Sequence, residues 1–264
     1  MSNAGEARLS ELDAALDGQQ VTPQIAEELF AVVDLLDAQP TLRRALTDPG
    51  LEPNGRAALI DSLFGSRVSA ATVQVLRQAV QLRWGGSAAL VAALDRQGVR
   101  AVATSAQQAG TLDQVEDELF RFGRLVAGDP ALRSALSNRS ASLSARQQLV
   151  SDLLDGKADA ATIYLSRRAV AARTRSFDLT LDGYLAVAAA QRGRAVAHVV
   201  VARPLTDEQQ QRLVTALGGQ LGRAVSLQVV VDPDVLGGMR VTVGDEIIEG
   251  TVADRLELAR RQIS

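Results

Sequence analysis

The stretch VVVDPDVLGGMRVTVGDEIIEGT, residues 229–251, has the pattern of three short strands joined by tight turns. Its β-branched run ends at Asp232-Pro233, because proline has no N–H group to donate within a central strand. Met239–Val243 then alternates apolar and polar side chains, which is the period of a half-buried strand. After a Gly-Asp turn and an apolar pair, Thr251 can cap a closing helix at Val252–Ile263. The stretch therefore predicts strands and a hairpin within a small α/β domain.

The residues just upstream complete this domain, which we expect to span residues 193–264. Ala195–Ala202 is rich in valine and of strand length, and Pro204 closes it. Thr206, followed by acidic side chains, is typical of a helix N-terminus. A second strand, Val225–Val231, follows that helix. The expected order is strand, helix, strand, hairpin and helix.

The chain before residue 193 has the helical period, with apolar side chains three and four positions apart. This region repeats itself after 90 positions: Glu28-Leu29-Phe30 recurs as Glu118-Leu119-Phe120, and Arg56 recurs as Arg146. Roughly a third of the aligned positions are identical, which indicates an internal duplication.

The fold class that follows is multidomain and mainly α. Two consecutive helical bundles, residues 1–102 and 103–192, precede the small α/β domain. Within the first bundle the periodicity predicts a helix at Ala70–Trp84, and after a glycine pair another at Ser87–Gln97. Residues 1–17 have one apolar stripe and predict a short amphipathic helix.

The composition is that of an ordinary globular protein of 264 residues, with 47% hydrophobic and 22% charged residues. Aromatic residues make up only 3%, so the cores are expected to consist of Ala, Leu and Val. The net charge of -3 gives no general attraction to nucleic acid or to anionic lipid. There is no cysteine, which excludes disulfides and thiolate metal ligands. The sequence shows no secretory signal and no apolar run long enough to span a bilayer.

The sequence predicts no catalytic, cofactor-binding or metal site. His198 is the single histidine and lies in an apolar strand-like run, where a structural role is favoured over a metal or catalytic one. The nucleophile elbow Gly-x-Ser-x-Gly and both glycine-rich phosphate motifs are missing. Gly237-Gly238 could present amides to an anion, but a turn is the favoured interpretation. Arg167-Arg168, with Arg173 and Arg175, is basic, and we expect these side chains to pair with acidic neighbours or with a partner protein.

Two phenylalanines allow two interpretations, because Phe120 and Phe122 point to roughly opposite sides of one helix. One of them can enter the bundle core while the other cannot easily do so. Ordinary packing against a neighbouring unit is the favoured interpretation. The functional alternative is a groove that accepts an amphipathic partner helix.

The final stretch resembles the C-terminal signature of the delta subunit of F-type ATP synthase, the counterpart of the mitochondrial oligomycin-sensitivity-conferring protein (OSCP). The resemblance rests on the order and spacing of the motifs along the chain. They are Asp232-Pro233, Gly237-Gly238, the strand Met239–Val243, Gly244-Asp245, Ile247-Ile248, Glu249-Gly250-Thr251 and Arg255-Leu256. The bundle at 103–192 resembles the N-terminal bundle of the family. The extra bundle at 1–102 departs from the common form and is similar to a long actinobacterial form.

This resemblance implies a non-catalytic stator subunit of the peripheral stalk, which resists the torque of the rotor during proton-driven ATP synthesis. The implied partners are N-terminal helices of the alpha subunits and the C-terminal end of the b subunit. Association with the cell membrane would be peripheral, on its cytoplasmic side, and only through the complex. By helix order, the resemblance implies partner contact on the first and fifth helices of this bundle. The implied positions are Leu119, Phe122 and Leu125 on one, and Ile163, Leu165 and Val170 on the other. The alternative function is a free-standing helical adaptor that binds amphipathic helices of other proteins.

Overall fold

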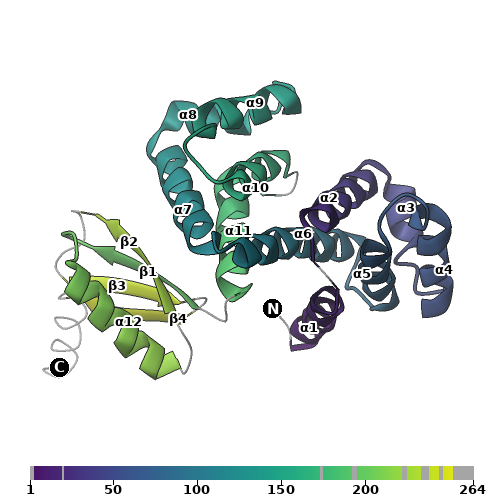
Figure 1. Ribbon diagram of the computed structural model, residues 1–264, viewed down its shortest axis with the longest axis horizontal. Coiled ribbons are helices and arrows are strands. Elements are labelled where there is room, and N and C mark those ends of the chain that lie inside the picture. The colour runs from purple at the N-terminus through teal and green to yellow at the C-terminus, as the bar shows by residue number, and fades with distance from the viewer. Residues whose placement is uncertain are drawn as a thin grey trace, which may run out of the picture. The chain divides into compact units, whose positions relative to one another are not determined.

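The computed structural model describes residues 3–19, 21–172, 175–191, 195–221, 225–232, 238–243 and 246–251. The chain divides into two compact units, Met1–Val187 and Ala188–Ser264. Helices make up the first unit and a small sheet with a helix makes up most of the second, which confirms the mainly α, multidomain fold class (Figure 1). Within the described ranges, no helix has both the length and the apolar character that crossing a bilayer requires.

The helices begin where the sequence provides suitable first-turn residues. Prolines occupy the first turn of four helices of the first unit, where the missing N–H group costs nothing. Side chains of Ser69, Asp129, Ser142 and Asp159 accept hydrogen bonds from first-turn amides of four helices. The helices are α1 (Asn3–Asp17), α2 (Pro23–Ala38), α3 (Pro40–Ala45), α4 (Pro53–Phe64), α5 (Ala70–Gln81), α6 (Ser87–Ala109), α7 (Leu112–Gly128), α8 (Pro130–Ser137), α9 (Leu143–Leu154), α10 (Ala160–Ala171) and α11 (Phe177–Gln191).

The repeat seen in the sequence is also a repeat of structure. Shifted by 90 positions, α2 to α5 fall on α7 to α10 in the same order. By the same shift α1 falls on residues 93–107, the second half of α6. The last helix of the first repeat is therefore also the first helix of the second.

Helix α6 is longer than the sequence predicted, since it continues past Gln97 to Ala109. Gly98 does not interrupt it: a Cβ atom there would lie 2.7 Å from Cε1 of Phe30, so the glycine allows α2 to approach closely. The helix ends at Gly110, whose left-handed conformation (φ 76°) is the usual helix terminator. Residues 97–103 are all buried, so neighbouring helices surround this part of α6. The expected boundary between residues 102 and 103 lies inside this helix, and the division into two bundles stays a prediction.

A glutamate at the same position of each repeat joins two helices. Glu28 of α2 accepts hydrogen bonds from the Ser69 amide at 3.0 Å and the Thr72 hydroxyl at 2.6 Å, at the start of α5. Glu118 of α7 does the same at the start of α10, where the Asp159 amide lies at 2.8 Å and the Thr162 hydroxyl at 2.7 Å. A carboxylate at a helix N-terminus is stabilised by the free amides and by the helix dipole.

These two carboxylates are expected to make the helical unit sensitive to acid. Burial raises the pKa of Glu28 and of Glu118, but the hydrogen bonds outweigh burial, so both pKa values lie below the ordinary 4.5. A lowered pKa in the folded state gives stability that is present above the unfolded pKa and is lost as the pH falls through the folded pKa. At pH 7, Glu28→Gln or Glu118→Gln should each lower the free energy of unfolding by about 1 kcal/mol.

Urea titrations at pH 7 and at about pH 3.5 check this expectation. The variant carrying both substitutions should lose less stability between the two pH values than the unsubstituted chain. Glu52→Gln on the exposed turn before α4 is the control. An equal loss in all the chains would contradict this role of the two glutamates.

The second unit is a four-stranded sheet in the order β2-β1-β3-β4. β1 pairs in parallel with β2 and antiparallel with β3, which pairs antiparallel with β4. The core consists of Ala197, Val199 and Val201 of β1 with Leu217 and the inward valines of β3. The elements are β1 (Ala195–Val201), α12 (Asp207–Leu221), β2 (Val225–Val231), β3 (Gly238–Val243) and β4 (Glu246–Thr251).

The strands, the helix and the hairpin predicted for this unit are confirmed. Val241 and Val243 are buried while Arg240 is exposed, as the alternation predicted. The turns predicted at 233–237 and 244–245 and the helix predicted at 252–263 lie outside the described residues.

Candidate partner-binding surface and the junction between the repeats

Among the described residues, no group of three or more His, Asp or Glu side chains could hold a metal ion. His198 lies in the middle of β1, opposite Gln228 of β2 and Thr242 of β3, so its backbone belongs to the sheet.

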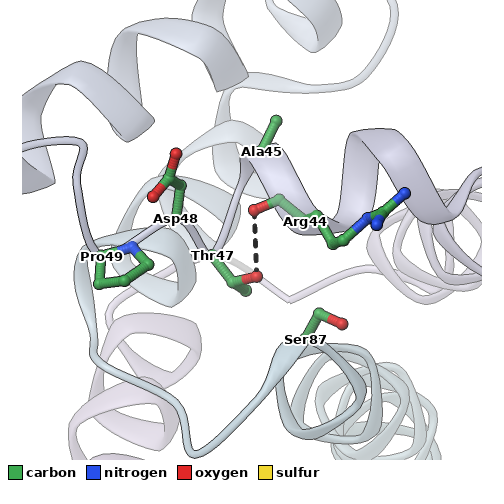
Figure 2. Close-up of a pocket in the computed structure, with 6 residues that line it drawn as sticks. All are labelled: Arg44, Ala45, Thr47, Asp48, Pro49 and Ser87. Carbon is green, nitrogen blue, oxygen red and sulfur yellow. Dashed lines mark hydrogen bonds between the residues drawn. The ribbon is translucent and has the colours of Figure 1, made fainter.

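A surface pocket of about 360 Å³ lies at the turn between α3 and α4 and at the start of α6 (Figure 2). The Thr47 hydroxyl donates to the carbonyls of Arg43 at 3.0 Å and Arg44 at 3.3 Å. The Asp48 carboxylate accepts the Gly50 amide at 2.8 Å. The turn itself therefore engages these two polar groups. The residues that line the pocket are Arg44, Ala45, Thr47, Asp48, Pro49 and Ser87.

A second pocket, of about 270 Å³, lies where α2 meets α9 and α10, and so between the two repeats. Phe30 and Tyr164 both line it, and their ring centroids lie 5.8 Å apart. Charges of both signs line it: Glu27 and Asp34 from α2, and Arg167 and Arg168 from α10.

Arg168 is the centre of the contacts beside this pocket. Its guanidinium donates to Asp95 of α6 at 3.0 and 3.1 Å and to Asp34 of α2 at 2.5 Å. It also lies over the Phe30 ring, 4.7 Å from the centroid, in cation–π geometry. The Tyr184 hydroxyl of α11 donates to the other Asp95 oxygen at 3.1 Å. One largely buried cation thus connects four helices, and the predicted pairing of this basic stretch with acidic neighbours is confirmed for Arg168.

The electrostatics of this cluster keep Arg168 cationic and Tyr184 protonated. Burial raises the pKa of the Asp95 carboxyl, and the Arg168 guanidinium opposes this shift without cancelling it. Burial lowers the pKa of Arg168, but Asp95 and Asp34 raise it above its usual range, so this side chain stays cationic. Burial and the Asp95 charge raise the pKa of Tyr184, so its phenol stays protonated and donates its hydrogen bond.

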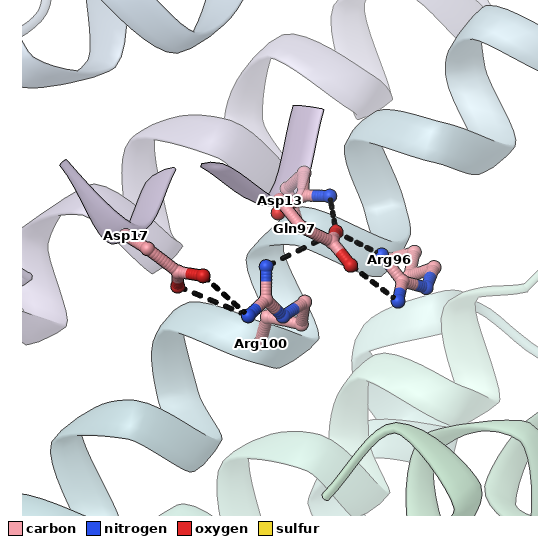
Figure 3. Close-up of polar contacts among 5 residues, drawn as sticks. All are labelled: Asp13, Asp17, Arg96, Gln97 and Arg100. Atoms are coloured by element: carbon pink, nitrogen blue, oxygen red, sulfur yellow. Dashed lines mark hydrogen bonds and ion pairs between the residues drawn. The ribbon is translucent and has the colours of Figure 1, made fainter. Parts of the chain in front are cut away.

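A separate polar seam holds α1 against α6 (Figure 3). Asp13 pairs with Arg96 and with Arg100 and accepts the Gln97 amide at 2.6 Å, while Asp17 pairs with Arg100 at 3.0 Å. Burial raises the pKa of Asp13, but the bonds from Arg96 and Gln97 outweigh it, so the carboxyl has a pKa below its usual range. The positions 90 residues later carry no charged side chains, so the seam belongs to the first repeat alone.

The six positions implied for partner contact differ in exposure. Leu125 of α7 is 54% exposed and Ile163 of α10 is half-buried. The other four are buried in the helical core: Leu119, Phe122, Leu165 and Val170.

The two phenylalanines of α7 do face different surroundings, as their spacing predicted. Phe122 is buried and meets Phe177 edge to face at a centroid distance of 5.8 Å, whereas Phe120 is half-buried.

Asp34, Asp95 and Tyr184 were not among the residues that the sequence singled out. They lie 134, 73 and 16 positions from Arg168, and the sequence alone carries no signal that joins groups so far apart on separate helices. The one sequence signal for this cluster was the basic pair Arg167-Arg168, which predicted acidic neighbours or a partner protein.

The structure shows a repeated set of helices that share α6 and are joined by internal ion pairs, with a small α/β unit after them. The sequence model of the ATP synthase delta (OSCP) subunit matches residues 96–263. ATP synthase subunit delta of Streptomyces avermitilis is 47% identical over 263 residues, with 99% of this chain and 96% of the relative covered. The proteins of the same name from Cutibacterium acnes and Kineococcus radiotolerans are each 43% identical, with 96% and 90% of this chain and 96% and 87% of the relatives covered.

The chain belongs to the ATP synthase delta (OSCP) subunit family. It is a component of the peripheral stalk, the stator of ATP synthase, as the resemblance implied. The family match begins inside α6, so residues 1–95 lie outside it, whereas the actinobacterial relatives match both repeats. Counted from residue 96, α6 is the first helix of the matched region, α7 is the second and α10 is the fifth. Leu119, Phe122 and Leu125 therefore lie on the second of these helices, not on the first.

Proposed function

We propose that the chain links N-terminal helices of the alpha subunits to the C-terminal end of the b subunit, and that it resists rotor torque without catalysing a reaction. It associates with the cytoplasmic side of the cell membrane through the complex. The observation that carries this proposal is family membership over nearly the whole chain, with relatives that are themselves delta subunits. A free-standing helical adaptor is not favoured, since the similarity extends through both repeats and the α/β unit.

The three parts of the chain divide this work. Residues 1–102 and 103–192 are the helical bundles that face the catalytic hexamer, and 193–264 is the domain that holds the b subunit. Support for a helix-binding role of the second bundle comes from its accessible apolar side chains, Leu125 and Ile163. The four buried positions, Leu119, Phe122, Leu165 and Val170, support this surface from below by fixing α7 and α10 in the core.

Charged substitutions at the two accessible positions are expected to weaken binding of an alpha-subunit N-terminal peptide. Leu125→Asp with Ile163→Asp in the full chain should raise the dissociation constant at least about tenfold, because each removes apolar contact area and places a charge there. Isothermal titration with the peptide measures this effect.

Leu143→Asp is the matched control, since Leu143 is exposed on α9 but is not assigned to the contact. Circular dichroism confirms that each variant is folded. Peptide binding that is unchanged in the double variant, or weakened equally by the control, would contradict the assignment of this surface.

A further inference from the structure

We propose that Arg168 is the centre of a clamp that holds the two helical repeats together as one rigid body. The clamp consists of Phe30 and Asp34 of α2, Asp95 of α6, and Tyr164 and Arg168 of α10. With the clamp closed, the helical unit is one stiff body and not two bundles on a hinge. This inference goes beyond the proposed function, and it concerns the isolated chain whatever partner that chain binds.

The first support is that these contacts cross from one repeat to the other. α2 belongs to the first repeat and α10 to the second, yet Asp34 and Arg168 form an ion pair at 2.5 Å. The Phe30 ring packs on Tyr164 as well as under Arg168, so one side chain of α2 contacts two of α10. Apolar, cation–π and ionic contacts therefore coincide at one place between the repeats.

The second support is that the clamp cation is fully engaged. The side chain of Arg168 is only 12% exposed, and its donors reach two carboxylates on different helices. A planar guanidinium can contact both carboxylates and stack on a ring at the same time, which a lysine ammonium cannot do. Without Arg168, the partly buried Asp95 carboxylate would lose its cation, so opening of the junction is favoured.

The third support is the place where the chain can bend. α6 runs through both repeats and carries Gly98 in its interior, where a glycine lowers the resistance of a helix to bending. Phe30 packs directly on that glycine while it contacts α10. The clamp therefore contacts α6 at Gly98, the position where this helix bends most easily.

A distance measurement between spin labels tests the clamp. The chain has no cysteine, so Ser62→Cys on α4 and Ala145→Cys on α9 place one exposed label on each repeat. Double electron–electron resonance on the full chain should give one narrow distance distribution. Arg168→Gln should at least double its width or add a second distance. Arg167→Gln is the matched control, because Arg167 is the exposed neighbour on the same helix, and it should leave the width unchanged.

A second variant covers the case in which Arg168→Gln does not fold. Phe30→Leu with Asp34→Asn removes the α2 side of the clamp and leaves the Arg168–Asp95 pair in place. This folded double variant should broaden the distribution by a similar factor. A distribution that stays narrow in the folded clamp variants, or that is already broad in the unsubstituted chain, would overturn the proposal. Peptide binding is measured separately, so failure of the clamp and failure of the proposed function are distinguishable.

Discussion

Replacing Arg56 with methionine is expected to lower the free energy of unfolding of the helical unit by about 3 kcal/mol. The Arg56 side chain is buried and donates to four backbone carbonyls instead of to a carboxylate. Nε bonds the Val80 oxygen at 2.6 Å, and Nη1 bonds those of Leu51 at 2.5 Å and Asp48 at 3.0 Å. Nη2 bonds the Gln81 oxygen at 3.3 Å.

These acceptors explain the size of the effect. Val80 and Gln81 are at the C-terminal end of α5, where helix carbonyls have no partner within the helix and the dipole favours a cation. Methionine fills much of the same volume but donates nothing, so several carbonyls lose their hydrogen bonds in a buried place. The free energy follows from urea titrations monitored by circular dichroism at pH 7.

The repeat provides the control for this experiment. Arg146 occupies the equivalent position and is less buried, and it bonds the carbonyls of Val170 at 3.0 Å and Leu136 at 3.3 Å. Arg146→Met should therefore cost about 1 kcal/mol. A larger loss in Arg146→Met than in Arg56→Met would contradict this account of the two arginines.

Substituting Gly98 with leucine should destabilise the helical unit by about 3 kcal/mol. Even a Cβ atom at this position would lie within 2.7 to 2.9 Å of three atoms of the Phe30 ring. That ring is buried and packs between α6 and α10, so it has little freedom to move away. The gain in helix propensity on replacing glycine, about 1 kcal/mol, is too small to offset the overlap.

A second substitution shows whether the overlap with Phe30 is the cause. Phe30→Leu should destabilise the chain by itself, but its effect and that of Gly98→Leu should be clearly less than additive in a double-mutant cycle. Gly55→Ala in α4 is the control, since a Cβ there meets nothing within 4 Å and should be neutral or slightly stabilising. Strict additivity of the first two substitutions would argue against the overlap as the cause.

Much of the fold could be predicted from the sequence because its signals are local or periodic. Proline and Ser, Thr or Asp caps mark helix starts, valine-rich alternation marks the strands, and the 90-residue repeat follows from identities such as Glu28 with Glu118. Several residues of α5 recur in α10 in the same order. The structure shows that Glu28 and Glu118 accept equivalent hydrogen bonds from these two helices.

The length of α6 was underestimated for a physical reason. Glycine usually lowers helix stability, and only the position of Phe30 explains why Gly98 is kept inside a helix. Whether a glycine breaks a helix or allows close packing depends on a contact between elements that the sequence does not encode locally.

The partner surface was harder to predict, because core and groove positions have the same apolar periodicity. Leu119 and Leu125 lie on one helix with similar composition around them, yet one is buried and the other is exposed. To predict the pairing of Arg168 with Asp34 and Asp95, one must know how three helices are arranged in space. Its basic character was visible in the sequence, and its partners were not.

Purification of the tagged chain from its native membranes is the most direct test of the central claim that it is a stator subunit. The chain should be extracted in mild detergent and purified by its tag, and the co-purified proteins should be quantified by mass spectrometry. The account predicts that the alpha and b subunits of ATP synthase are recovered with the chain at near-stoichiometric yield. Recovery of the folded chain free of every ATP synthase subunit would contradict it.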